Sequence, residues 1–253
     1  MNTLLSLQDV TVQFGGLIAV NHVSIDVDSG TIHSLIGPNG AGKTTVINTV
    51  TGVYAPTSGS VAFGGRTISG MPPHRISALG LARTFQNTEL FGEMSVADNV
   101  RLGLFRIKPY GLGSAATNLP HVRRTEREID ERTNTLLDLV SLSDQAHVEA
   151  RFLPFAKMRR LELARALATE PQLLLLDEPA AGLRSGEIDE LNGILTMLRD
   201  RLAMTILLVD HVMPVVMGIS DRISVVNFGQ KIAEGTPQEV RTNPAVISAY
   251  LGH

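Results

Sequence analysis

One stretch constrains the fold of this chain more than any other. It reads GPNGAGKTT from Gly37 to Thr45 and fits the pattern G-x-x-x-x-G-K-[ST]. Residues 31–36 before it form a short, half-apolar run of strand type, and residues 46–51 after it can continue a helix that Gly52 would end. A strand, a glycine-rich loop and a helix in this order predict a P-loop.

Each residue type in this loop suits the binding of phosphate. Glycines let backbone N–H groups approach phosphate closely, and the following helix presents the positive end of its dipole. Lys43 can reach the β- and γ-phosphates, and the Thr44 hydroxyl can ligate Mg²⁺. An ordinary glycine-rich turn is the alternative, but it does not account for the strand, the Lys-Thr pair and the helix together. We expect the phosphates to be bound by Gly37, Pro38, Asn39, Gly40, Ala41, Gly42, Lys43, Thr44 and Thr45.

The composition narrows the classes of protein that remain. The chain has 253 residues, enough for one large domain or for a domain with two lobes. A formal net charge of −3 gives no overall excess of positive charge that would favour binding to nucleic acid. The lack of cysteine excludes a disulfide framework and a Cys-based metal site. Residues 1–7 do not resemble a signal peptide, and the apolar runs at 173–176 and 206–209 are too short to span a bilayer. We therefore expect any role at a membrane to depend on a partner.

The spacing of apolar residues along the chain predicts an α/β core interrupted by a helical lobe. Alternation over 5–12 and 23–27 predicts half-buried antiparallel strands, and a further short strand is expected at 61–65. Residues 87–165 are mostly of helical type, with an apolar stripe at 129, 136, 137 and 140. Strands are then expected at 173–176, 206–209 and 223–226, with an amphipathic helix over 188–198. Thr236, Pro237 and Glu239 predict a capping box at the start of a helix near the C-terminus.

A second motif adds a pair of carboxylates. Four leucines at 173–176 are followed by Asp177, Glu178 and Pro179. A P-loop needs an acid opposite it to hold Mg²⁺, and the carboxyl end of a neighbouring parallel strand is where that acid is expected. We assign this role to Asp177, and we expect Glu178 to orient or deprotonate an attacking water. Two exposed carboxylates after a core strand are the alternative interpretation.

The order of these motifs resembles that of an ABC-type ATP-binding subunit, and the resemblance covers nearly the whole chain. It rests on the P-loop, a lone glutamine at Gln86, the Leu-rich strand with Asp177 and Glu178, and a late histidine, His211, after an apolar strand. The resemblance implies an α/β fold: a RecA-like P-loop NTPase core with an antiparallel β subdomain and an inserted α-helical subdomain. It implies one ABC-type domain over 1–253, with the core in 1–86 and 166–253 and the helical subdomain in 87–165.

The resemblance also implies roles for three further residues. Gln86 corresponds to the glutamine that touches Mg²⁺ or its water, which makes it a candidate metal ligand beside Thr44 and Asp177. His211 corresponds to the histidine that contacts the γ-phosphate, and Phe14 to the aromatic that stacks on adenine. A lone Gln, His or Phe is weak evidence, and the weight lies in their order and spacing about the P-loop. The implied cofactors are ATP and Mg²⁺, and the implied catalytic set is Glu178, His211, Gln86 and Lys43.

Within this superfamily the chain is most similar to ATPases of branched-chain amino-acid uptake systems. The similarity rests on the stretches 14–21, 82–87, 159–167, 177–183 and 232–237. It implies an ATP-hydrolysing subunit that energises import of branched-chain amino acids or a related small solute. The implied partners are a second ABC ATPase subunit, in a homo- or heterodimer, integral-membrane permease subunits and, indirectly, an extracytoplasmic solute-binding protein. The implied location is the cytoplasm, peripheral on the inner face of the cell membrane.

The signature loop of the family, Leu-Ser-Gly-Gly-Gln, is altered in this chain. Residues 153–158 read LPFAKM, so Pro154 replaces the serine, Ala156 the second glycine and Lys157 the glutamine. Proline offers neither an N–H nor a hydroxyl, and alanine adds a Cβ where close backbone approach is wanted. Arg184 also stands where the family has Asp. In this family each of two nucleotide sites combines the P-loop of one subunit with the signature loop of the other. We therefore expect the site that uses the signature loop of this chain to be the weaker of the two, which would suit a heterodimer with a paralogous subunit.

Two other functions are compatible with these motifs. A nucleotide-binding regulatory subunit with weak catalysis would fit the altered signature loop, although it needs neither Glu178 nor His211. An ABC-type ATPase not coupled to transport usually carries long coiled coils or two fused cassettes, which do not fit in 253 residues with one P-loop. A P-loop kinase or GTPase would leave Gln86, the 159–167 helix and His211 unexplained.

Overall fold

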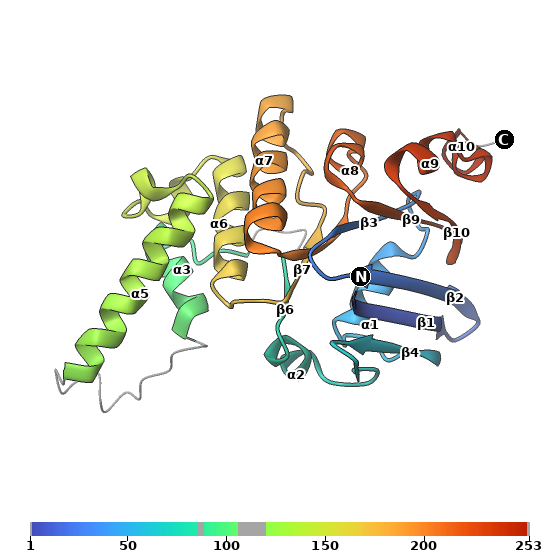
Figure 1. Cartoon of the computed structure of the whole chain (residues 1–253), viewed down its shortest axis with the longest axis horizontal. Helices are drawn as coiled ribbons and strands as arrows, with labels where there is room; N and C mark the ends of the chain where they lie inside the picture. The colour runs from blue at the N-terminus through green and yellow to red at the C-terminus, as the bar shows by residue number, and fades with distance from the viewer. Residues whose placement is uncertain (1, 85–88, 106–119, 252–253) are drawn as a thin grey trace. The chain divides into compact units, whose positions relative to one another are not determined.

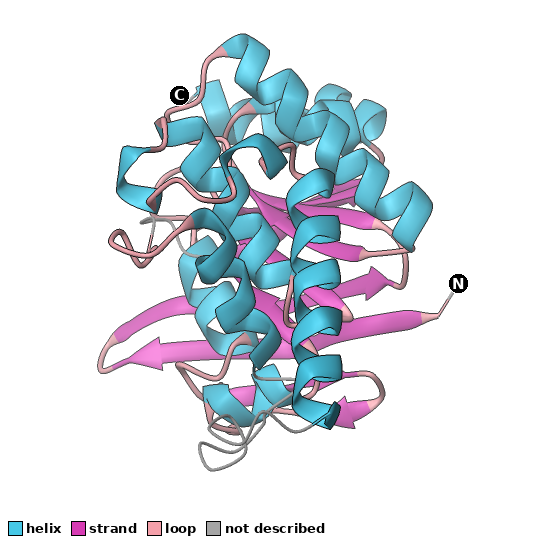
Figure 2. Cartoon of the chain, turned by 90° about the vertical axis from the view of Figure 1, so that its left-hand side faces the viewer, coloured by secondary structure: helices cyan, strands magenta, loops and turns pink. Residues whose placement is uncertain are grey.

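The computed structural model describes residues 2–84, 89–105 and 120–251. The chain forms two compact units: residues 1–83 with 172–253, and residues 84–171. Helices and strands are labelled in Figure 1, and Figure 2 shows the same elements coloured by type. The subdomain boundaries at 86/87 and 165/166 remain predictions from the sequence.

The first unit contains both sheets of the described chain. Its strands are β1 (Thr3–Phe14), β2 (Leu17–Asp28), β3 (Ile32–Ile36), β4 (Ser58–Phe63), β5 (Arg66–Thr67), β6 (Leu81–Arg83), β7 (Leu173–Asp177), β8 (Thr205–Val209), β9 (Arg222–Asn227) and β10 (Gln230–Gly235). Its helices are α1 (Lys43–Val50), α2 (Pro73–Ala78), α7 (Ser185–Leu202), α8 (Met213–Ile219), α9 (Pro237–Thr242) and α10 (Pro244–Leu251).

The smaller sheet is antiparallel and has the strand order β2-β1-β4-β5. Buried and exposed residues alternate along β1 and β2, as the sequence predicted for half-buried strands. The strand expected at 61–65 begins earlier and ends earlier, because β4 runs from Ser58 to Phe63 and pairs with β1 from Ser58 onward. The backbone pairing of β4 thus overrides the local preference of glycine and serine for a turn.

The larger sheet has the order β10-β9-β3-β8-β7-β6, and all of its neighbours except the β9–β10 hairpin run parallel. Every residue of β3, β7 and β8 is buried, which is the pattern of central parallel strands covered on both faces. The three predicted strands at 173–176, 206–209 and 223–226 are confirmed. The strand predicted before the P-loop is also confirmed as β3, and all of its residues are buried although its sequence is only half apolar.

Two hydrophobic clusters cover the opposite faces of this larger sheet. One joins Leu35 and Val226 to the buried residues of α1 and of the smaller sheet, so α1 packs between the two sheets. The other joins Ile36 and Val225 to Val216 of α8 and to residues of α9 and α10. Neighbouring residues of one strand enter different clusters because successive side chains point to opposite faces. Figure 1 shows α7 and α8 on the face of the sheet away from α1.

The second unit is helical in its described part. It contains α3 (Val96–Phe105), α5 (Pro120–Leu139), the short 3₁₀ turns η1 (Ser143–Gln145) and η2 (Ala150–Phe152), and α6 (Phe155–Leu167). The predicted apolar stripe is confirmed, because Ile129, Leu136, Leu137 and Val140 are all buried. Gly103 of α3 lies so close to the end of α6 that a Cβ there would meet Ala168 and the Arg165 carbonyl at 2.7 Å.

The ends of two helices follow the sequence signals. α1 ends at Val50, and Gly52 adopts a left-handed φ of 76° two residues later. Glu239 donates its N–H to the Thr236 hydroxyl at 3.4 Å, and the Thr236 N–H reaches the Glu239 carboxylate at 2.7 Å. The capping box at the start of α9 is therefore confirmed. Among the residues that the structure describes, no helix is long and apolar enough to cross a membrane.

A buried histidine makes the stability of the first unit, residues 1–83 with 172–253, depend on pH. His33 of β3 is almost fully buried and shares a hydrogen bond of 2.9 Å with Ser224 of β9. Burial lowers the pKa of His33 from 6.5 to about 4, although the negative charge of Glu234 opposes the shift. A lowered pKa in the folded state means that stability is fully present above pH 6.5 and is lost as the pH falls towards 4.

We predict that lowering the pH from 7 to 5 reduces the free energy of unfolding by about 2 kcal/mol through His33. Urea unfolding at the two pH values measures this difference. The His33→Gln variant, which keeps a polar side chain but does not titrate, should lose most of it. An equal pH dependence in wild type and His33→Gln would contradict the prediction.

Candidate nucleotide-binding site

The P-loop takes its shape from close backbone contacts. Gly37 follows β3 so tightly that a Cβ would lie 2.1 Å from the Val226 carbonyl oxygen. Gly42, with a φ of 101°, precedes the first turn of α1, and a Cβ there would lie 2.6 Å from the Ala19 carbonyl oxygen. Glycine is therefore required at both positions by the fold itself. The predicted strand, loop and helix occur in the expected order.

Lys43 lies in the first turn of α1 with its ammonium group inside the loop. Its Nζ donates hydrogen bonds to the carbonyl oxygens of Gly37 at 2.7 Å and Pro38 at 2.9 Å. Burial lowers the pKa of Lys43, and the negative charges of Glu178 and Asp177 oppose that shift. The lysine predicted to meet phosphate is thus held in the loop, within electrostatic range of both predicted carboxylates.

A cleft of about 340 Å³ opens beside the loop. It is lined by the loop residues 40–45, the start of β2 and the β9–β10 turn. Gly229 in that turn donates its N–H to the Ala41 carbonyl at 3.0 Å, so the turn is tied to the loop. The complete lining is Leu17, Ile18, Ala19, Gly40, Ala41, Gly42, Lys43, Thr44, Thr45, Phe228 and Gly229.

Phe14, predicted to stack on adenine, is not part of this lining. It ends β1 with a half-exposed ring, and this ring packs edge-on against Tyr54 with a centroid separation of 5.0 Å. Tyr54 follows α1 and was not identified from the sequence. The pair places an accessible aromatic surface in the same unit as the P-loop.

Asp177 is the last residue of β7, as the sequence predicted for the metal-binding acid. Its Oδ2 lies 2.8 Å from Nη2 of Arg83, the last residue of β6. Strands β6 and β7 are parallel neighbours, so their carboxyl ends meet at one edge of the sheet. The sequence predicted no role for Arg83, because its contact with Asp177 depends on the strand order.

Glu178 and His211 are brought together from two neighbouring strand ends. The Nδ1 of His211 lies 3.6 Å from Oε1 of Glu178. Glu178 adopts a left-handed φ of 50°, and its N–H donates to the Val209 carbonyl at 2.7 Å. This uncommon conformation for a non-glycine residue is held by the contact with β8 and marks a position where strain is tolerated.

Asp210 organises the loop that carries His211. Its buried carboxylate accepts hydrogen bonds from the N–H groups of Ala180 at 3.0 Å, His211 at 2.7 Å and Val212 at 2.9 Å. One side chain therefore ties the loop after β7 to the loop after β8. The sequence analysis assigned no role to Asp210, although an acid directly after a buried parallel strand was a usable signal.

The remaining predicted residues lie elsewhere or outside the description. Gln86 falls outside the described residues. In the helical unit, Pro154 directly precedes α6, and Ala156 is buried in the first turn of that helix. The exposed rings of Phe152 and Phe155 lie under the guanidinium groups of Arg151 at 5.0 Å and Arg159 at 5.1 Å. Arg184 precedes α7 in the other unit, and its N–H donates to the Glu187 carboxylate at 2.8 Å.

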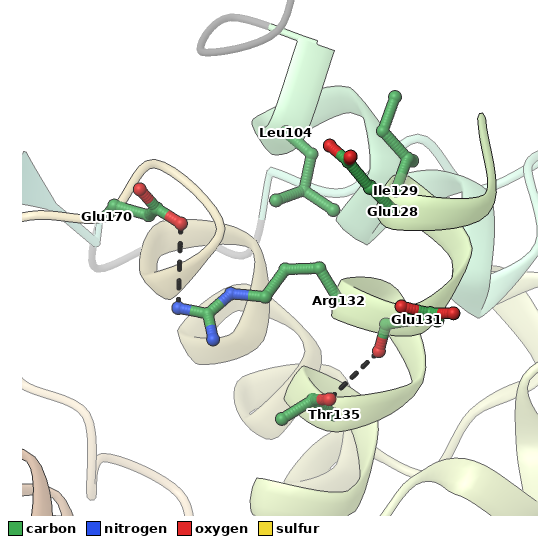
Figure 3. A pocket seen from close by; sticks show the side chains of 7 residues that line it. All are labelled: Leu104, Glu128, Ile129, Glu131, Arg132, Thr135 and Glu170. Atoms are coloured by element: carbon green, nitrogen blue, oxygen red, sulfur yellow. Dashed lines mark hydrogen bonds and ion pairs between the residues drawn. The ribbon is translucent and has the colours of Figure 1, made fainter. Parts of the chain in front are cut away.

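A second cleft, of about 410 Å³, lies within the helical unit and holds none of the predicted site residues. Figure 3 shows Arg132 crossing it to Glu170, with 3.6 Å between their charged atoms. The Thr135 hydroxyl donates to the Glu131 carbonyl at 2.9 Å. The lining is Leu104, Glu128, Ile129, Glu131, Arg132, Thr135 and Glu170, and its charged groups are partly neutralised within the cleft.

The loop, the lysine and the carboxylates at neighbouring strand ends define a P-loop nucleoside triphosphatase. Comparison with known proteins agrees: residues 20–181 match the family "ABC transporter", and residues 230–253 match "Branched-chain amino acid ATP-binding cassette transporter". The chain belongs to the ABC transporter family, in the group of branched-chain amino-acid transport ATP-binding proteins.

Individual relatives cover almost the full chain. The high-affinity branched-chain amino acid transport ATP-binding protein LivG of Salmonella typhimurium is 46% identical over 249 residues, 98% of each chain. BraF of Pseudomonas aeruginosa, described in the same words, is 44% identical over 98% of each chain. Among solved structures, the ADP conformation of MJ1267, an ATP-binding cassette of an ABC transporter, matches with a TM-score of 0.85 and 29% identity over 100% of both chains.

These findings confirm the predicted family and the predicted fold class, a P-loop NTPase core with an antiparallel β subdomain and a helical subdomain. The match to the branched-chain group confirms the narrower assignment that the sequence motifs indicated. The roles of the individual site residues stay predictions.

The contacts of Gly37 predict a sharp difference between two glycine substitutions. Gly37→Ala should destabilise the protein by roughly 1–3 kcal/mol and abolish tight nucleotide binding, because the new Cβ would displace the loop from Val226. Gly193→Ala, at an exposed position of α7 where a Cβ meets nothing within 4 Å, is the matched control and should stabilise by about 0.5–1 kcal/mol. Thermal unfolding and nucleotide titration measure both. Equal effects of the two substitutions would contradict the prediction.

Proposed function

We propose that this chain hydrolyses ATP to drive the import of branched-chain amino acids or a related small solute through a membrane permease. The observation that carries the proposal is the contact between Glu178 and His211 at 3.6 Å. The negative charges of Glu178 and Asp177 also act on the pKa of Lys43 in the P-loop. The relatives' shared name, a transport ATP-binding protein for branched-chain amino acids, supports the choice of solute.

Binding of the triphosphate falls to the loop and to α1. Backbone N–H groups of residues 37–45 and the positive end of the α1 dipole hold the phosphates. Lys43 exchanges its bonds to the Gly37 and Pro38 carbonyls for bonds to phosphate oxygens. Because burial already disfavours the charged lysine, a nearby triphosphate should be a strongly preferred partner. Phe14 provides a half-exposed ring for the adenine base.

Mg²⁺ fits the residues at hand. The Thr44 hydroxyl and the Asp177 carboxylate offer oxygen ligands, which this ion prefers. Asp177 lies at the carboxyl end of β7, and its negative charge opposes the lowering of the Lys43 pKa by burial. Gln86 is the third proposed ligand. When bound, Mg²⁺ neutralises charge on the β- and γ-phosphates.

Hydrolysis itself falls to the pair at the strand ends. Glu178 accepts a hydrogen bond from the attacking water and orients it, and His211 contacts the γ-phosphate while its ring is aligned by Glu178. Asp210 keeps His211 in place through its three backbone hydrogen bonds. As water adds to the γ-phosphorus, its proton passes to Glu178, and the bond between the γ-phosphorus and the bridging oxygen breaks to give ADP and phosphate.

We further propose the partners and the location that the family implies. Two ATPase subunits sandwich two nucleotides, the helical subdomain passes the closure of this dimer to integral-membrane permease subunits, and a solute-binding protein delivers the solute outside. The chain then works on the inner face of the cell membrane. ATP binding closes the dimer and hydrolysis reopens it.

The role of Glu178 can be tested by an isosteric change. We predict that Glu178→Gln in the assembled transporter retains ATP binding but lowers phosphate release by about 10²–10⁴-fold, because the neutral amide still accepts a hydrogen bond but cannot take up the proton of the attacking water. Glu190→Gln, at an exposed position of α7, is the matched control and should keep full activity. Unchanged phosphate release in Glu178→Gln would instead favour a regulatory, nucleotide-binding subunit.

The altered signature segment 153–158 favours an unequal pair of sites. Pro154 cannot donate a hydrogen bond, and the first turn of α6 carries Ala156 and Lys157 in place of glycine and glutamine. The site completed by this segment should therefore be the weaker one, and a paralogous subunit should supply the stronger segment.

This asymmetry predicts how activity depends on concentration. The purified chain should bind ATP, yet its phosphate release per chain should stay near background as its concentration rises. Adding the paralogous subunit should raise the rate, and Ala156→Gly should raise it in the chain alone. A rate per chain that climbs with the concentration of the unmodified chain would show that segment 153–158 works in a homodimer.

A further inference from the structure

Arg83 connects the helix that begins in the P-loop to the predicted metal-binding carboxylate. Its Nη1 donates to Asn48 Oδ1 of α1 at 2.8 Å and reaches the Thr51 hydroxyl at 3.4 Å. Its Nη2 donates to Asp177 Oδ2 at 2.8 Å. One guanidinium group therefore fixes the far end of α1 relative to the end of β7.

This ion pair is largely buried. The side chains of Arg83 and Asp177 are only 12% and 10% exposed. Removing two charges from water costs several kcal/mol, so a buried pair is weak evidence for stability alone. An apolar pair of similar volume could join α1, β6 and β7 equally well, which indicates that the charge on Asp177 has a further use.

The geometry of the pair suggests that use. The printed contact engages Oδ2 of Asp177, and the carboxylate has a second oxygen with lone pairs of its own. The side chain is thereby fixed at one oxygen, in the unit that also contains Lys43 and Thr44. A fixed carboxylate loses less rotational freedom when it takes up a ligand.

We propose that Arg83 is a positioning residue for the divalent cation: it holds Asp177 so that the metal-dependent part of nucleotide binding depends on Arg83. The inference rests on the proposed function, because it takes Asp177 as a metal ligand. Arg83 does not touch the cation. It acts as the supporting partner of a ligand, a role whose loss typically lowers metal affinity about 10–100-fold.

The test compares ATP affinity with Mg²⁺ and with EDTA, so that it does not depend on turnover. Wild type, Arg83→Gln and Arg83→Lys are titrated with a fluorescent ATP analogue as full-length chains, and a thermal melt reports the folded fraction. The gain in affinity on adding Mg²⁺ should fall about tenfold in Arg83→Gln and be partly restored in Arg83→Lys, which keeps the charge. Arg199→Gln is the matched control. Arg199 also pairs with a carboxylate, that of Asp221, with 3.1 Å between the charged atoms, but this pair lies away from the P-loop.

A double-mutant cycle shows whether Arg83 acts through Asp177. In an Asp177→Asn background, Arg83→Gln should change the Mg²⁺-dependent gain no further. An equal loss of affinity with and without Mg²⁺ would assign Arg83 a structural role only and overturn the inference, as would an unchanged gain. If wild type itself gained nothing from Mg²⁺, the assignment of Asp177 as a metal ligand, and with it the proposed function, would fail first.

Discussion

The close approach of backbone segments around the P-loop is the constraint on which the rest of the site depends. The loop is confined between the carbonyl of Val226 and the carbonyl of Ala19, and both approaches admit only glycine at Gly37 and Gly42. The Gly229 N–H closes the same region by bonding to the Ala41 carbonyl. With the loop fixed in this way, Lys43 can be buried and still face a triphosphate, because the surrounding backbone rather than mobile side chains defines its position.

The parallel sheet then gathers the chemical groups at one edge. Strands β6, β7 and β8 are neighbours, and the residues at or just after their carboxyl ends are Arg83, Asp177, Glu178, Asp210 and His211. Adjacent strand ends are joined by the pair of Arg83 with Asp177 and by the hydrogen bond from the Ala180 N–H to Asp210, which also accepts the His211 N–H. Because these groups stand on strands rather than on long loops, their positions are held more precisely.

Much of the fold and of the site was accessible from sequence, where the signal is local. The P-loop spacing, the apolar strand before Asp177 and the Thr236 capping box each depend on residues within one short segment, and each was found. The start of β4 was misplaced because pairing with β1 overrides the turn preference of its glycine. The contact between Phe14 and Tyr54 was missed because the two rings come from segments 40 residues apart in sequence and meet only through packing.

The sequence by itself determined which groups are present and at which strand ends they stand: the loop with Lys43, the carboxylates Asp177 and Glu178, and the late His211. Only the tertiary structure decided which of them touch. The bond of Arg83 to Asp177 and the role of Asp210 follow from the strand order β8-β7-β6, which no local pattern encodes. The physical reason is that apolar parallel strands carry similar side chains, so their neighbours are selected by the packing of the whole sheet.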